Sequence, residues 1–205
     1  MTVAGLIAVR VEFGAGNLET VETAVASLRS NWTGARLDCF LGRRDERLAQ
    51  VWLLAEPSDA SQDGADRLGH LASEAFRDRD GLRVDGCEAT LLGEEATIGG
   101  ETNESPWLMA IPYETSPEEA AELDRWYEEE HTEMLLRCPD WVRVRRFQVT
   151  STYGAAWNRL VLHDLSTEEV ISTAEVAASM QTPWRLALAQ RPWFLAGGRR
   201  PLRRL

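Results

Sequence analysis

The chain has 205 residues, a net charge of −11 and a hydrophobic share of 44%, which is enough apolar material for a packed core. The acidic balance disfavours nucleic-acid partners, because a protein that binds phosphate backbones needs a positive face. All 22 basic residues are arginines, and the absence of lysine excludes Schiff-base chemistry and a Walker-type phosphate site.

The cysteines and the N-terminal segment favour a cytoplasmic protein. Cys39, Cys87 and Cys138 are odd in number and widely spaced, so we expect buried free thiols in a reducing compartment. The apolar stretch 3–9 is too short to span a membrane and no basic segment precedes it. Heavy use of Arg, Ala and Gly is typical of a bacterial source. The prediction is a soluble protein with neither nucleic acid nor membrane as a partner.

The first hundred residues follow a βαββαβ order. Val21, Val25 and Leu28 recur at helical spacing, whereas other apolar segments are short and rich in β-branched residues, as strands are. The expected elements are a strand at Val3–Phe13, a helix at Leu18–Trp32, strands at Arg36–Leu41 and Leu48–Ala55, a helix at Ala65–Arg77 and a strand within Leu82–Ile98.

The second half repeats this order after an expected linker at Gly99–Ser105. Ser116 is placed as a helix N-cap, with Pro117 at the first helical position and Glu119 at the third, which predicts a capping box. The expected elements are a strand at Trp107–Tyr113, a helix at Pro117–Cys138, strands at Trp141–Thr150 and Trp157–Asp164, helical segments over Thr167–Met180 and on to Gln190, and a closing strand at Trp193–Ala196.

Two βαββαβ series in tandem predict an α+β fold of two ferredoxin-like repeats, residues 1–100 and 105–205. Each repeat would have helices on one face of its sheet and a partly apolar second face. Packing the two sheets face to face buries both and leaves room for a cavity between them. The prediction is therefore an intramolecular α+β barrel, present as a monomer or a homodimer. The four C-terminal arginines, 199, 200, 203 and 204, are interpreted as a solvated tail.

His131 is the strongest candidate for catalysis among the three histidines. At 100° per residue it falls on the apolar stripe of helix Pro117–Cys138, one turn after Tyr127. A titratable imidazole on such a face needs either a hydrogen-bond partner or a cavity. The pattern alone favours neither of two alternatives, a core histidine whose hydrogen bonds are formed within the protein and a functional histidine. Aligning the repeats places Ala24 opposite His131, which makes the first repeat a scaffold.

The other two histidines and one arginine have weaker signals. His163 lies in a strand, where it could face the space between the sheets or lie near the strand end in water; a structural role is favoured. His70 is interpreted as a member of a surface ion pair. Alternation along Trp141–Thr150 places Arg145 on the face opposite Val144, so it could hold a substrate oxygen in the cavity or be solvated at a rim.

The segment 124–131, DRWYEEEH, followed by LLRCPDW at 135–141 and RRF at 145–147, resembles the EthD-like branch of the dimeric α+β barrel superfamily. That branch carries a W-Y-x-x-E-H pattern on its first helix and then a P-G-W turn, where this chain has Asp140 in place of the glycine. The resemblance covers about 107–194, and the first repeat matches in topology only.

The resemblance implies a cofactor-independent enzyme of the isomerase, cyclase, dehydratase, lyase or monooxygenase kind, acting on a planar oxygenated or aromatic polyketide-like substrate. It implies His131 as the general acid–base and no cofactor or metal. The predicted substrate-binding residues are Tyr113, Trp126, Tyr127, Arg145 and His163. Two alternatives stay open: a haem-binding barrel with His131 as axial ligand, and a non-catalytic protein that binds a hydrophobic metabolite.

Overall fold

The structure is a computed structural model, and it describes residues 5–15, 20–34, 36–57, 64–97, 105–196 and 199–205. The chain forms two units: residues 1–91, 149–156 and 202–205 make the first, and residues 92–148 and 157–201 the second. Two short segments of the second half thus belong to the first unit. The predicted linker at Gly99–Ser105 lies, except for Ser105, outside the described residues.

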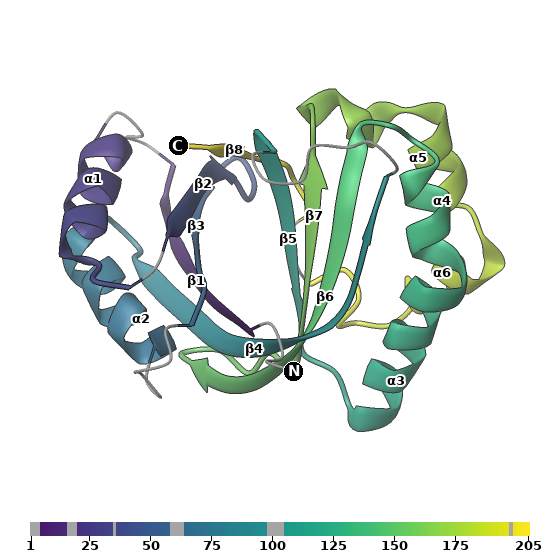
Figure 1. The fold of residues 1–205 in the computed structure, drawn as a ribbon, viewed down its shortest axis with the longest axis horizontal. Helices are drawn as coiled ribbons and strands as arrows, with labels where there is room; N and C mark the ends of the chain where they lie inside the picture. The colour runs from purple at the N-terminus through teal and green to yellow at the C-terminus, as the bar shows by residue number, and fades with distance from the viewer. Residues whose placement is uncertain (1–4, 16–19, 35, 58–63, 98–104, 197–198) are drawn as a thin grey trace. The chain divides into compact units, whose positions relative to one another are not determined.

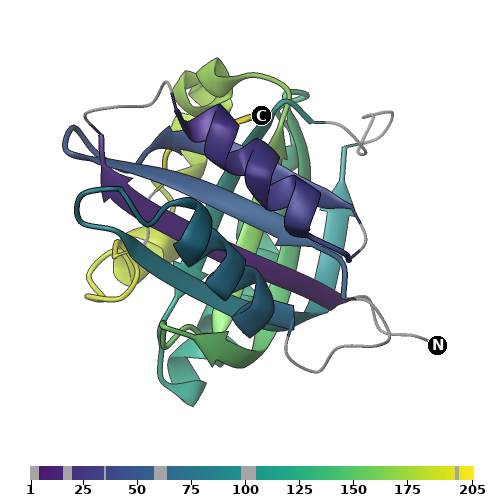
Figure 2. The same ribbon diagram turned by 90° about the vertical axis from the view of Figure 1, so that its left-hand side faces the viewer.

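The first unit is an antiparallel sheet with two helices on one face (Figures 1 and 2). Its strands pair in the order β4–β1–β3–β2–β8. Along the chain, the first four strands of this order alternate with two helices in the order βαββαβ. The elements are β1 (Gly5–Gly14), α1 (Val21–Asn31), β2 (Leu37–Arg43), β3 (Leu48–Ala55), α2 (Gly64–Ala75), β4 (Arg83–Ala96) and β8 (Leu202–Arg204).

Alternation along β1 explains this packing. Val9, Val11 and Phe13 lie in the core with α1 and α2, whereas Arg10 and Glu12 take the opposite face. All three cysteines are buried free thiols, as expected. His70 is exposed and makes an edge contact with the ring of Tyr153, so the predicted surface ion pair is not formed among the described residues.

The second unit also places its helices over one face of a sheet (Figure 1). Its strands pair antiparallel in the order β5–β7–β6. Apolar residues at alternate positions of β5 and β7 pack beneath the helices. The elements are β5 (Trp107–Tyr113), α3 (Pro117–Trp126), the π-helix η1 (Tyr127–His131), α4 (Thr132–Leu136), β6 (Trp141–Tyr153), β7 (Arg159–Leu165), the 3₁₀ helix η2 (Glu168–Ser172), α5 (Ala174–Ser179) and α6 (Pro183–Leu188).

The long helix predicted at Pro117–Cys138 begins as expected but is not regular. The Ser116 hydroxyl accepts from the Glu119 N–H and the Glu119 side chain accepts from the Ser116 N–H, which is the predicted capping box. At residues 127–131 the helix changes to π geometry, and the Thr132 N–H donates to the Tyr127 carbonyl five residues back. This turn therefore contains one residue more than a turn of α-helix.

The closing strand predicted at Trp193–Ala196 is wrong. Pro192 offers no N–H, the Phe194 N–H donates to the Arg191 carbonyl, and the Ala196 N–H donates to the Trp193 carbonyl, so the segment forms local turns. The ring of Phe194 is buried in the core of the second unit. The last strand is instead β8, which pairs with β2 in the first unit.

Strand β6 also departs from the simple alternation expected for Trp141–Thr150. A register shift against β7 lies between Trp141 and Arg143. Because a bulge moves the residues beyond it to the other face, Trp141 joins Val144 in the helix-side core instead of sharing a face with Arg145. Within the described residues, no helix combines the length and the apolar character needed to cross a membrane.

Candidate functional site

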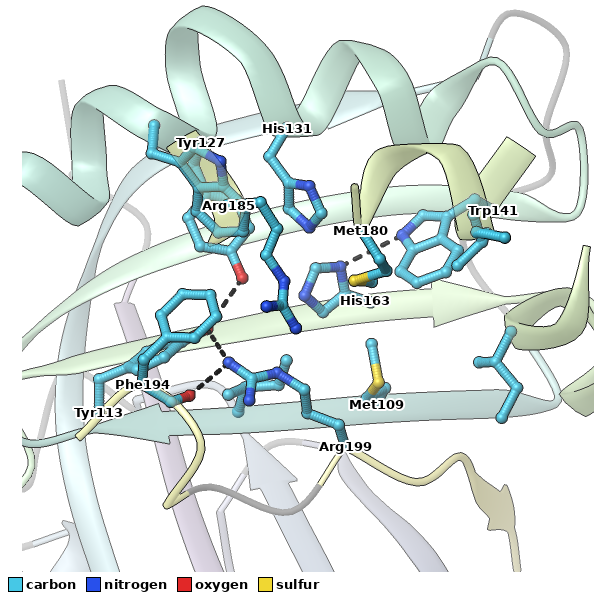
Figure 3. A pocket seen from close by; sticks show the side chains of 15 residues that line it. Met109, Tyr113, Tyr127, His131, Trp141, His163, Met180, Arg185, Phe194 and Arg199 are labelled. Atoms are coloured by element: carbon cyan, nitrogen blue, oxygen red, sulfur yellow. Dashed lines mark hydrogen bonds between the residues drawn. The ribbon is translucent and has the colours of Figure 1, made fainter. Parts of the chain in front are cut away.

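A cavity of about 250 Å³ lies within the second unit, between its sheet and its helices (Figure 3). Side chains of β5 and β7 form one wall, and α3, η1, α5 and α6 contribute the others. The lining residues are Met109, Ile111, Tyr113, Trp126, Tyr127, His131, Trp141, His163, Ile171, Val176, Ala177, Met180, Arg185, Phe194 and Arg199.

This position corrects the expected location of the site. The sequence placed the cavity between two stacked sheets, with His131 opening into it. All the lining residues belong to the second unit, and those of β5 and β7 are the ones that face the helices. His131 therefore faces a cavity between helix and sheet, because its helix covers the very sheet face that the cavity uses.

The π turn creates the most distinctive contact of the pocket. In an α-helix, Trp126 and His131 would lie about 140° apart around the axis, since five residues span 500°. The wider turn aligns residues i and i+5, and the two rings stack with centroids 3.9 Å apart and planes at 17°. Leu135 and Cys138 follow on the same buried face. At a regular 100° per residue, Trp126 would lie only at the margin of the apolar stripe.

Glu130 fixes this stacked pair to a neighbouring helix. Its Oε1 accepts from the indole Nε1 of Trp126 at 3.0 Å and from the hydroxyl of Thr182 at 2.6 Å. Thr182 is the N-cap of α6, where its oxygen accepts from the Arg185 N–H. One carboxylate thus joins the turn that carries His131 to the helix that carries Arg185.

His131 is a buried imidazole without a hydrogen bond. Its exposed fraction is 4%, its Nδ1 is buried without a partner, and within the described part of the chain no group bonds to its ring. Burial lowers the pKa of His131 well below the ordinary 6.5, and the neighbouring His163, Arg185 and Arg199 lower it further. The ring is therefore neutral at pH 7, with one nitrogen unprotonated and able to accept a proton.

His163 has the complementary chemistry. The indole Nε1–H of Trp141 donates to its Nδ1 at 3.2 Å, so in the neutral ring the proton must lie on Nε2. That Nε2 is buried and has no partner among the described residues. Burial, and then the charge of Arg199, lower the pKa of His163 to about 3. His163 is thus a hydrogen-bond donor with its basic nitrogen already occupied.

Two tyrosines connect the pocket to Arg199. The hydroxyls of Tyr113 and Tyr127 are 3.2 Å apart, and Arg199 Nη2 donates to the Tyr113 oxygen at 3.2 Å. Burial raises the pKa of Tyr127 well above 10, so the phenol keeps its proton. The ring of Tyr127 lies 5.4 Å from that of His131 and 6.0 Å from that of His163.

Arg185 and Arg199 are functional candidates that the sequence analysis missed. The C-terminal arginines were expected to form a solvated tail, but Arg199 is half-buried and reaches the pocket, where it also donates to the Phe194 carbonyl. Arg203 and Arg204 pair with Glu22 and Asp38 of the first unit. Neither location carries a local motif, since that of Arg185 depends on where α6 docks and that of Arg199 on where the chain returns after α6.

Arg145 is not part of this pocket, contrary to expectation. It lies on the sheet face away from the helices, where Nη2 contacts Asp164 at 3.1 Å. Asp164 is 2% exposed and also binds Arg143 at 2.7 Å. Of the predicted residues, the structure brings together His131, Tyr113, Trp126, Tyr127 and His163, while Arg145 serves a structural ion pair.

No protein-family model matches the chain, and no curated protein matches its sequence. Solved structures do match. An anthrone oxidase-like protein is 11% identical, with a TM-score of 0.60 over 98% of this chain and 91% of that chain. A monooxygenase candidate from Fusobacterium nucleatum subsp. nucleatum is 9% identical, with a TM-score of 0.61 over 100% and 94%. A single-residue mutant of chlorite dismutase from Candidatus Nitrospira defluvii is 13% identical, with a TM-score of 0.59 over 98% and 92%.

At these identities the likeness shows the fold alone, which is a mixed α/β fold that this chain shares with those proteins.

Proposed function

We propose that the second unit is a small-molecule enzyme in which His131 removes a proton from carbon next to a carbonyl group of a planar, oxygenated substrate. The observation that carries this proposal is the contrast between two buried imidazoles in one pocket. His131 has a basic nitrogen available, whereas the Trp141 bond makes His163 a donor. Enolisation requires one group of each kind, a base for the carbon and a donor for the oxygen.

The step balances as a proton transfer. His131 takes the proton, the electrons of the C–H bond move toward the carbonyl, and the resulting enolate oxygen accepts from the Nε2–H of His163. Returning the proton to another carbon completes an isomerisation. A positioned base contributes roughly 10²–10⁴-fold to such a step, and an oxyanion donor roughly 10²–10³-fold. The stacked Trp126 and the apolar walls exclude water from the pair.

We further propose that residues 1–100 and 105–205 are related repeats, that the second belongs to the EthD-like branch, and that the first is a scaffold. The corresponding strand orders β1–β3–β2 and β5–β7–β6 support the repeat. The names of the structural neighbours, anthrone oxidase-like and monooxygenase, agree with an oxygenated aromatic substrate.

The test is hydrogen–deuterium exchange at the acidic carbons of anthrone and 2-tetralone, followed by NMR in deuterated buffer. The wild type should catalyse exchange with at least one ketone. His131→Ala should lower the rate at least a hundredfold and His163→Gln roughly ten- to a hundredfold. Arg145→Gln is the matched control and should exchange at the wild-type rate. Full activity in His131→Ala, or no catalysed exchange of either ketone by the wild type, would overturn the proposal.

Haem binding is the second candidate, favoured by the free imidazole of His131 and by chlorite dismutases among the neighbours. Two histidines and two arginines suit the iron and the propionates. The cavity volume does not suit haem, because about 250 Å³ lies below the roughly 300–1,000 Å³ of pockets that hold drug-sized ligands. The residues as placed therefore do not fit the macrocycle. A hemin titration followed in the Soret region decides the matter, and a saturable one-to-one shift lost in His131→Ala would favour haem.

A further inference from the structure

Two arginines in the pocket have no acidic partner within the described residues. The Arg185 guanidinium makes no hydrogen bond or ion pair there, and Arg199 binds only the Tyr113 hydroxyl and the Phe194 carbonyl. Cations in a partly buried, apolar setting are costly unless an anion accompanies them. The chain carries 33 acidic residues against 22 basic ones, so their absence at this point is notable.

Other arginines of the same unit do have such partners. Arg143 and Arg145 share Asp164, and two more arginines pair with glutamate or aspartate of α3 or η1. Those two pairs are Arg146 with Glu128 and Arg159 with Asp124. Among the half-buried and buried arginines of the described part of this unit, only Arg185 and Arg199 thus have no acidic partner.

The two guanidinium groups also converge. Both lie over the ring of Phe194, at 5.0 Å for Arg185 and 4.5 Å for Arg199. Figure 3 shows both side chains reaching into the pocket. Burial lowers the pKa of Arg185, and the charge of Arg199 lowers it further, which is the mark of like charges held near each other. An anion between them would remove this repulsion.

The charge balance suggests what that anion is. With His131 and His163 neutral, the pocket has two positive charges and no negative one among its described lining residues. A carboxylate would cancel one charge, and its planar oxygens match a guanidinium fork. If the proposed proton transfer occurs, the enolate cancels the second charge, and only this last step rests on the proposed function.

We propose that the pocket recognises an aromatic carboxylate, whose ring lies against the apolar walls and whose carboxylate is bound by Arg185 and Arg199. The natural substrate is accordingly a keto or hydroxy acid built on a planar ring. Neutral molecules of the same shape bind more weakly, because they leave both cations without a counter-charge.

The test compares 2-naphthoate with its neutral isostere 2-naphthamide by calorimetry on the full chain. The wild type should bind the acid at least tenfold more tightly. Arg185→Gln and Arg199→Gln should each raise the Kd of the acid roughly ten- to a hundredfold, as the loss of a charged hydrogen bond does. The Kd of the amide should change less than threefold. Arg191→Gln, at an exposed arginine of the same segment, is the matched control and should alter neither.

Equal affinity for acid and amide, or a preference that survives in both glutamine variants, would overturn the proposal. Arg199 also holds the Phe194 carbonyl, so Arg185→Gln, which breaks no hydrogen bond of its side chain, is the decisive variant. Binding that discriminates without any ketone exchange would remove the enzyme proposal and leave the anion site.

Discussion

Mild acid should destabilise this protein through its two buried histidines. Both imidazoles are neutral in the folded chain, since burial lowers the pKa of His163 to about 3 and that of His131 well below 6.5. In the unfolded chain the same groups have ordinary pKa values of about 6.5. Between these limits the unfolded state binds more protons, so stability is highest above pH 6.5 and falls as the pH decreases.

The size of the effect follows from the same values. Lowering the pH from 7.5 to 5.5 costs about 1.4 kcal/mol for each histidine that protonates only when unfolded. The pair together should therefore cost about 3 kcal/mol, a large part of the roughly 5–15 kcal/mol that stabilises a typical domain. The value applies fully to His163 and His131 because they are 1% and 4% exposed.

Urea unfolding followed by tryptophan fluorescence at pH 7.5 and 5.5 measures this cost. His131→Gln and His163→Gln should each lower the difference between the two pH values by about 1.4 kcal/mol, and the double variant by about 3 kcal/mol. All other ionisable groups are common to the four proteins and cancel in the comparison. A wild-type protein as pH-sensitive as the double variant would refute the claim that these rings are buried and neutral.

Three further substitutions test individual contacts. Trp141→Phe should lower the free energy of unfolding by about 1–3 kcal/mol, because it leaves the buried Nδ1 of His163 without a donor. ¹⁵N NMR should then show that His163 no longer holds a fixed Nε2–H tautomer, and an unchanged tautomer contradicts the assignment. Arg145→Gln should cost about 1–3 kcal/mol, because the carboxylate of Asp164 loses the charged hydrogen bonds from one of its two half-buried arginines. Ketone exchange should stay intact, and a loss of exchange would return Arg145 to the site. Glu130→Ala should slow exchange about tenfold by loosening the groups that position the base, whereas a wild-type rate would deny it that role.

Much of the fold could be predicted because local patterns determine it. Residues 107–113 are a short, continuous apolar run, as a buried strand can be, and form β5 with the predicted bounds. The capping signal at Ser116 depends on residues three apart, so it was also visible in the sequence. Local signals of this kind do not report where distant segments meet. The interpretation of Trp193–Ala196 as a strand failed for that reason, since its aromatic side chains are used for packing under α3.

The site was predicted in part. The helix histidine and its aromatic neighbours were found because they share one amphipathic face, and that face is a property of a single segment. His163 was left open because strand alternation gives two faces without saying which one the helices cover. Arg185 and Arg199 were missed because the first depends on where α6 docks and the second on the return of the chain past α6. The bulge in β6 likewise has no clear sequence signal and moved Trp141 to the functional face.

The π turn gives the protein a length-sensitive element at its centre. Removing one exposed residue there, such as Glu129, would let the segment relax into an uninterrupted α-helix, a more favourable backbone arrangement. The same deletion would leave Trp126 and His131 four residues apart, about 40° around the axis of an α-helix, so their rings would stay on one face. At its present length the chain keeps the imidazole on the indole only in π geometry, because relaxing the turn without a deletion would rotate everything beyond it by about 100°.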